Sequence, residues 1–142
     1  MPEERRQGTV SLPEKKVLGL VESVEIIGSK ATVEAKALID SGASRSSVDM
    51  RVAAKAGLGP IVSTSRVKCR SDGKGWNRRA IVKGDLVLHG VRKTVRFALT
   101  DRSEMAYPVL VGRDIIHPDF VIDVGKSHAS RKIGDERIPQ PK

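Results

Sequence analysis

Short β-rich runs separated by turn-forming residues extend from Val17 to Val124, and they constrain the fold class. Between Ala31 and Ile39 the apolar residues occupy every second position, which is the period of a half-buried strand. Aromatic residues make up only 3% of the chain, so aliphatic side chains must fill the core. The sequence therefore predicts a mostly β domain, closed into a small barrel, with one or two short helices.

Turn and cap residues set the boundaries of the expected elements. A helix is expected from Asp49, which caps it, to the residue before Gly57, and a second helix over 112–117. His89-Gly90 is expected to close a hairpin. The expected strands are 17–27, 31–39, 62–69, 79–82, 85–88, 91–99, 108–111 and 120–124.

The length of 142 residues predicts one domain. We expect residues 1–15 to be a flexible N-terminal arm, 16–125 the folded domain, and 126–142 a basic C-terminal tail. The sequence shows no signal peptide, no membrane-spanning run and a single cysteine, Cys69. These features favour a cytoplasmic protein without a membrane partner.

Positive charge is concentrated in the middle of the chain. The net charge is +9, and residues 66–96 hold ten Lys or Arg against Asp72 and Asp85, a local net of +8. This segment is either a set of solvated strand faces or a surface that attracts an anionic partner. Nucleic acid is not the favoured partner, because the segment has few aromatic residues for stacking and no recognised nucleic-acid motif.

The chemically distinctive motif is Asp40-Ser41-Gly42-Ala43, which directly follows an apolar strand. Asp, Ser and Gly are ordinary turn residues, so the motif alone is compatible with a simple turn. A carboxylate at a buried strand end is costly unless it is hydrogen-bonded or shares a proton. If a second carboxylate lay beside Asp40, one proton would be shared and the pair would serve as general acid and base.

Two segments together resemble the retropepsin family of aspartic proteases. The first is Asp40 to Ala43, and the second is Val109-Leu110-Val111-Gly112-Arg113-Asp114, where retropepsins have an apolar-apolar-Gly triplet under the catalytic loop. Between them, Cys69 to Arg79 takes the place of the β-hairpin flap that closes over substrate.

A closer resemblance is to the prokaryotic branch related to the RimB proteases, once labelled ATP-dependent zinc proteases. That branch has Asp-Thr-Gly-Ala-x-x-Ser early in the chain and a later Leu-Thr-Asp-Arg-Ser-x-Met-x-Tyr-Pro-x-Leu-x-Gly-Arg. This chain carries the later pattern from Leu99 to Arg113. The resemblance covers residues 17–125.

The resemblance implies an acid-protease barrel that forms a two-fold homodimer, an aspartic endopeptidase in which each subunit supplies Asp40. It also implies a peptide or protein substrate, an acidic or glutamate-rich preference, and a functional link to a RimK-like glutamate ligase. The implied catalytic residue is Asp40, and the residues that support its loop are Ser41, Gly42 and Ala43. The implied flap is Asp72, Gly73, Lys74, Gly75 and Trp76, and the motif under the site is Leu110, Val111, Gly112, Arg113 and Asp114. The charge of the basic hairpin itself suggests Arg70, Arg78 and Arg79 as contacts for an acidic substrate. Trp76 is equally compatible with a core anchor.

The chain departs from the family at two positions. Ser41 stands where Thr is usual, and Ser44 stands where viral retropepsins have the Asp that pairs with the Arg equivalent to Arg113. Arg113 therefore needs another acid, for which Asp49 or Asp114 are the candidates.

We expect neither metal nor cofactor. His89, His117 and His128 stand far apart in the sequence, and no zinc-binding helix motif is present. The competing hypothesis is a catalytically silent dimer of the same fold, which binds an acidic protein or nucleic acid through the basic segment.

Overall fold

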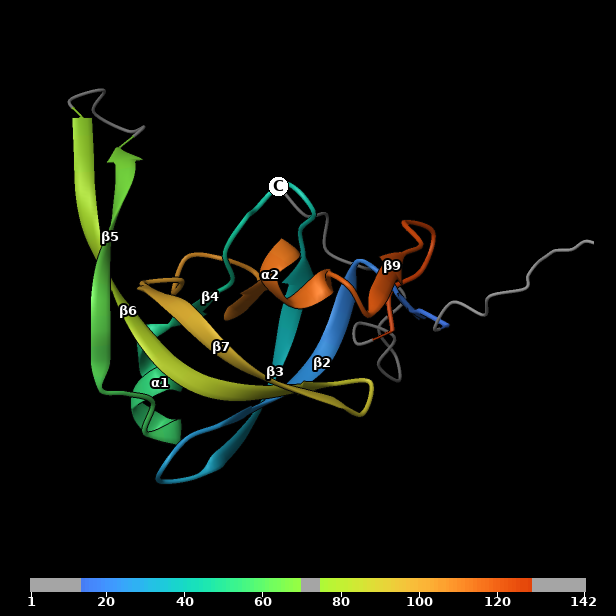
Figure 1. Cartoon of the computed structure of the whole chain (residues 1–142), viewed down its shortest axis with the longest axis horizontal. Coiled ribbons are helices and arrows are strands. Elements are labelled where there is room, and N and C mark those ends of the chain that lie inside the picture. Colours follow the sequence, from blue (N-terminus) through green and yellow to red (C-terminus); the bar gives the residue numbers. More distant parts are fainter. Residues whose placement is uncertain (1–13, 70–74, 129–142) are drawn as a thin grey trace, which may run out of the picture.

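The computed structural model describes residues 14–69 and 75–128, and strands dominate it (Figure 1). The strands are β1 (Lys16–Leu18), β2 (Val21–Ile27), β3 (Thr32–Ile39), β4 (Ser47–Asp49), β5 (Ile61–Cys69), β6 (Gly75–Leu88), β7 (Val91–Thr100), β8 (Val109–Val111) and β9 (Phe120–Ile122). The helices are α1 (Met50–Ala56) and α2 (Arg113–Ile116). The prediction of a mostly β domain with one or two short helices is confirmed.

Six of these strands close a barrel. Their order is β2-β3-β8-β4-β7-β6, and the ring closes because β2 also pairs with β6. β5 pairs with β6 outside the ring, and the β5–β6 hairpin projects away from the barrel (Figure 1). β1 and β9 form a separate two-stranded parallel sheet. Closure pairs the strands all the way round, so the predicted closed barrel is confirmed.

Aliphatic residues fill the barrel as the sequence pattern predicts. In β3, Ala37 and Ile39 are buried, and Val33 and Ala35 pack against the same core. Phe97 in β7 is the largest fully buried side chain. Strand alternation thus places one face of each half-buried strand in the core.

Two predicted boundaries are confirmed in detail. The Asp49 side chain caps α1 by accepting a hydrogen bond from the Arg51 N–H at 2.9 Å, and Gly57 ends the helix with φ of 78°. The β6–β7 hairpin turns through His89 and Gly90, with φ of 49° and 79°. Positive φ at both turn residues matches the twist of the flanking strands.

The prediction of one strand over 17–27 is wrong at Gly19 and Leu20, where the chain bends between β1 and β2. The bend packs against a distant segment of the chain. The Leu20 N–H donates to the Lys126 carbonyl at 2.7 Å, and a Cβ on Gly19 would lie 2.5 Å from that same oxygen. Only glycine permits this close approach, and it is a tertiary contact that the local pattern does not contain.

The predicted strands 79–82 and 85–88 are instead parts of one strand, β6. β6 pairs with β7 without interruption from Ile81 to Leu88, and this long-range pairing carries the strand through Gly84. Among the described residues, no helix is long and apolar enough to cross a bilayer.

Candidate active site

Asp40 lies directly after β3, at the end of the parallel pairing between β3 and β8. Its backbone N–H donates to the Val111 carbonyl at 2.9 Å. Its carboxylate oxygen Oδ1 accepts the Gly42 N–H at 2.8 Å, and its carbonyl accepts the Ala43 N–H at 3.2 Å. The half-buried carboxylate is therefore held by a tight turn at the barrel end, with Ser41 and Gly42 exposed.

The segment after β8 crosses directly beneath this turn. The Arg113 N–H donates to the Ala43 carbonyl at 2.8 Å, and the Arg113 guanidinium donates to the Ser41 carbonyl at 2.8 Å. A Cβ on Gly112 would lie 2.7 Å from the Ala43 carbonyl oxygen. Glycine at 112 thus lets the backbones touch, and Arg113 ties both ends of the turn to α2.

Arg113 does not bind either acid that the sequence suggested. Its guanidinium donates instead to the Ser41 carbonyl. Asp49 bonds to Arg51, and Asp114 bonds to Ser46. The expectation of an Asp49 or Asp114 partner is therefore wrong within the described residues.

Ser46 is a supporting residue that the sequence analysis missed. Ser46 is fully buried, and its hydroxyl donates to Asp114 Oδ1 at 2.7 Å. The Ser46 hydroxyl oxygen also accepts the Gly112 N–H at 2.9 Å. The Ser46 N–H also donates to Asp114 Oδ2 at 3.1 Å. The signal that would have found it is the final Ser of the Asp-Thr-Gly-Ala-x-x-Ser pattern, which falls at Ser46.

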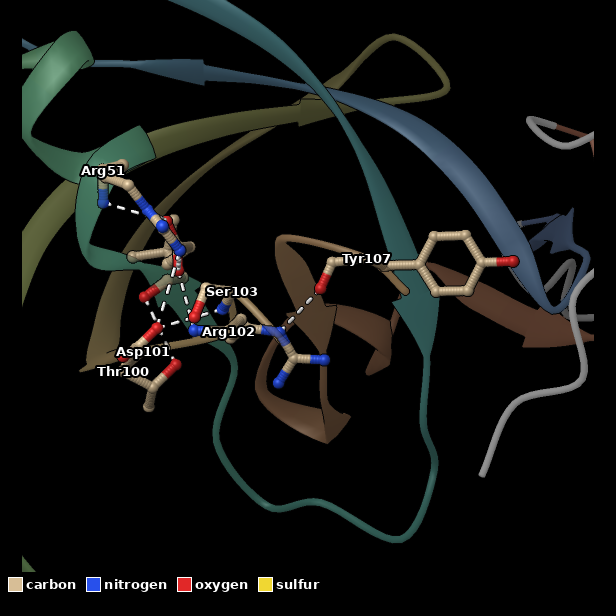
Figure 2. Close-up of polar contacts among 8 residues, drawn as sticks. Arg51, Thr100, Asp101, Arg102, Ser103 and Tyr107 are labelled. Atoms are coloured by element: carbon tan, nitrogen blue, oxygen red, sulfur yellow. Dashed lines mark hydrogen bonds and ion pairs between the residues drawn. The ribbon is translucent and has the colours of Figure 1, made fainter. Parts of the chain in front are cut away.

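A second polar cluster forms at the start of α1 (Figure 2). Asp49 is buried and accepts two hydrogen bonds from the Arg51 side chain and one from the Arg102 N–H at 2.7 Å. The Arg51 hydrogen bond is the main cause that holds the Asp49 pKa well below its usual value, with the Arg102 N–H adding to it. This cluster fastens the loop after β7 to the helix.

Arg102 reaches across that loop. Its Nε donates to the Tyr107 carbonyl at 2.8 Å, while the Tyr107 ring points away from the guanidinium (Figure 2). Burial lowers the Arg102 pKa below its usual value, against the attraction of Asp49. Within the Leu99–Arg113 pattern, Arg102 thus braces this loop through its contacts with Asp49 and Tyr107.

The flap residues are only partly within the described chain. Arg70, Asp72, Gly73 and Lys74 lie outside it, and Gly75 and Trp76 are placed as backbone at the start of β6. The exposed Arg78 donates to Thr64 Oγ1 at 3.2 Å across the hairpin. Arg78 and Arg79 line one hollow together with Arg102 and Met105.

Residues 53–132 match the RimB-like family, described as retropepsin-like aspartic endopeptidase RimB. This chain belongs to the RimB-like family. The match begins after Asp40, so membership rests on the hairpin, the Leu99–Arg113 segment and the region beneath the site, independently of the Asp motif. No curated protein sequence matches this RimB-like chain.

Several solved structures are similar to this chain, and the fold likeness rests on the first of them. Lpg0085 of Legionella pneumophila, a protein of unknown function (DUF785), is 18% identical with a TM-score of 0.56 over 80% of this chain and 97% of its own. The simian foamy virus (mac) protease is 18% identical with a TM-score of 0.49 over 68% of this chain and 90% of its own. The retroviral protease-like domain of Ddi1 from Leishmania major is 25% identical with a TM-score of 0.44 over 71% and 77%.

The structure brings together side chains that the sequence keeps far apart. In the described residues, Glu22, His89 and His128 place one potential ligand atom each within 4.8 Å of one another. His89 and His128 stand far apart in the sequence, but their side chains lie close together in the folded chain. Their separation in the sequence is therefore no argument against a metal site. His117 is not part of this group.

Proposed function

We propose that this RimB-like chain is an aspartic endopeptidase whose active site contains Asp40 from each of two subunits. The observation that carries the proposal is the Asp40 turn, held by Gly42 and braced from below by Gly112 and Arg113. A pre-positioned, partly exposed carboxylate costs no reorganisation when substrate arrives. The fold and the family support the same chemistry.

Hydrolysis by such a pair needs no metal. Two carboxylates close together share one proton, because both cannot ionise easily at short distance. The ionised Asp40 takes a proton from water, which attacks the peptide carbonyl carbon, while the protonated Asp40 donates a hydrogen bond to the carbonyl oxygen. The tetrahedral intermediate then collapses, a proton passes to the amide nitrogen, and the C–N bond breaks.

A two-fold dimer is required because the chain has one Asp-Ser-Gly-Ala motif. The β1–β9 sheet supports it. Val17 and Val121 face each other in this parallel pair, and they are 39% and 44% exposed. A two-stranded parallel sheet with an exposed apolar face is poorly stable alone, so strands from a partner subunit are expected to extend and cover it.

The dimer has its own test. We expect Val121→Asp to shift the chain to monomer in light-scattering measurements and to abolish cleavage, because a charge would enter the subunit contact. Val124→Asp is the control, since Val124 is 73% exposed beyond the strand. A Val121→Asp protein that stays dimeric would rule out this sheet as the contact.

The substrate class that fits the charge is an acidic or glutamate-rich peptide. Arg78 and Arg79 lie on the projecting hairpin beside the buried Arg102, and they line one hollow. Such a surface favours anionic peptides. A glutamate-rich substrate is also what the resemblance implies through its link to a RimK-like glutamate ligase.

Reversing both charges tests the preference. Arg78→Glu/Arg79→Glu should lower kcat/KM for acidic peptides more than for neutral ones, with each rate taken relative to wild type. Equal losses for both peptide classes would contradict the acidic preference and leave the protease assignment intact.

The decisive experiment is cleavage of an unstructured acidic peptide library by wild type, Asp40→Asn and Asp40→Ala across pH, with dimer mass recorded. Activity that is pepstatin-sensitive, chelator-resistant and lost in both variants supports the shared-Asp protease. A wild-type dimer that cuts nothing would overturn it in favour of a binding module.

A further inference from the structure

Glu22 is a carboxylate on the core-facing side of β2. It shares that side with Val24 and Ile26, and only 1% of its surface is exposed. A buried carboxylate is expensive unless it is paired with a charge or bound to a metal. An aliphatic side chain at position 22 would avoid the desolvation penalty of a buried carboxylate. The presence of Glu there therefore calls for an explanation.

Two histidines converge on this carboxylate from other parts of the chain. His89 Nε2 lies 2.8 Å from Glu22 Oε1, and His128 Nδ1 contacts Glu22 Oε2. The two imidazole rings are tilted by 50° with their centroids 5.3 Å apart. The Gly19 N–H donates to Oε2 at 2.6 Å, which orients the carboxylate from behind.

His89 occupies a backbone position that does not suit it well. It is the only non-glycine residue with positive φ in the described chain, at 49°. Asn or Asp is the usual residue at that position of a two-residue hairpin turn. A strained residue at a cluster of polar side chains points to a role for its side chain.

The barrel topology assembles the group. β2 pairs with β6 through Glu25 and Val87, and continuing that register brings Glu22 beside the His89 turn. His128 arrives on the segment after β9, which is tied to the β1–β2 bend by the Leu20 to Lys126 hydrogen bond. No local ligand spacing exists in the sequence because the three residues come from three separate segments.

We propose that Glu22, His89 and His128 form a binding site for a transition-metal dication of the Zn²⁺ class. Two imidazole nitrogens and a carboxylate oxygen are donors that Zn²⁺ accepts, and three protein ligands leave one position for water. Tetrahedral Zn²⁺ holds its ligand atoms roughly 3.3 Å apart. The three atoms already lie within 4.8 Å of one another, so small side-chain adjustments suffice.

The bound ion would fasten the segment after β9 to the barrel. It would join β2, the β6–β7 turn and this C-terminal segment at one point, close to the bend beside the β1–β9 sheet. The role is structural and separate from the carboxylate chemistry proposed for Asp40, so either proposal stands if the other fails.

The test uses the full chain after treatment with a chelator, in a Cys69→Ser background that removes the one thiol. Competition with a zinc indicator is expected to show one Zn²⁺ per chain. The unfolding temperature should rise by roughly 5 °C or more when Zn²⁺ is at a hundredfold excess over Kd. X-ray absorption should report two nitrogen donors from imidazole together with oxygen.

Single variants assign the ligands. His128→Gln and Glu22→Gln should each weaken Zn²⁺ binding by at least about 10-fold and reduce the thermal shift. The matched control is His117→Gln, which changes the histidine outside the group and should bind as wild type does. His128 lies near the end of the described chain, so its variant remains informative if Glu22→Gln does not fold.

Two outcomes would overturn the proposal. One is wild-type protein that binds no Zn²⁺; a lower unfolding temperature of His128→Gln would then identify the group as a hydrogen-bonded cluster. The other is Zn²⁺ binding that is unchanged in both His128→Gln and Glu22→Gln, which would place the ion elsewhere on the chain.

Discussion

Asp40 and Asp49 both lie at the end of a barrel strand, yet their surroundings are opposite. Asp49 is buried, and both of its carboxylate oxygens accept hydrogen bonds, from Arg51 and from the Arg102 N–H. Asp40 is half-buried, and among contacts between described residues its carboxylate accepts only the Gly42 N–H. One acid has its acceptor sites filled by the fold, whereas the other keeps acceptor capacity for something from outside.

This difference separates a structural acid from a candidate catalytic one. Hydrogen bonds to both oxygens of a carboxylate stabilise its charged form and hold the surrounding loop. This suits Asp49, which caps α1. A carboxylate with spare acceptor capacity can bind a proton, water or a second carboxylate. Variants at the two sites should therefore affect different properties.

The largest effect is expected on cleavage by Asp40→Asn. The amide cannot share a proton or act as a general base, so kcat/KM should fall by about 10²–10⁴-fold. The free energy of unfolding should change by less than about 1 kcal/mol, because one hydrogen bond is at stake. Peptide cleavage and urea titration measure both, with the exposed Glu25→Gln as control. If Asp40→Asn unfolded at a much lower urea concentration than wild type, Asp40 would be a structural acid like Asp49.

Asp49→Ala should show the reverse pattern. It removes the cap of α1 and leaves the Arg102 N–H without its acceptor, so unfolding should become easier by about 2–4 kcal/mol. Urea denaturation measures this, and Arg51→Ala is the control that keeps the carboxylate. If Asp49→Ala were as stable as wild type but inactive, Asp49 would have a catalytic role and not a structural one.

Gly112→Ala links stability to the Asp40 turn. The added methyl would lie 2.7 Å from the Ala43 carbonyl, so the crossing segment and the turn must separate. We expect a loss of about 1–3 kcal/mol in stability, together with reduced kcat at temperatures where the variant is folded. Gly125→Ala, where the nearest atom is a side-chain oxygen at 3.3 Å, is the matched control. An unchanged kcat would show that the contact with Ala43 does not position Asp40.

The smallest effect is on acid stability. The Asp49 pKa is lowered in the folded chain from 3.8, so its contribution to stability is present above that value and is lost as pH falls below it. The stability gap between wild type and Asp49→Asn should therefore narrow between about pH 5 and pH 2. A gap that stays constant over this range, by thermal unfolding, would show that Asp49 does not stabilise the fold through its charge.

The sequence by itself determined the features that depend on nearby residues. The alternation in β3, the Asp49 and Gly57 ends of α1 and the His89-Gly90 turn were all predicted, because a period or a cap acts within a few positions. Asp40 was singled out for the same reason, since an acid followed by small residues at a strand end is a local pattern.

Tertiary structure decided what lies beside what. The bend at Gly19 depends on Lys126, and the hydrogen bonds of Ser46 depend on Gly112 and Asp114. The partner of Arg113 likewise became a carbonyl of the turn above it. Such contacts depend on strand register and barrel closure, which join segments that are dozens of residues apart. No local pattern encodes them, so the grouping of Glu22 with two distant histidines became visible only in the folded chain.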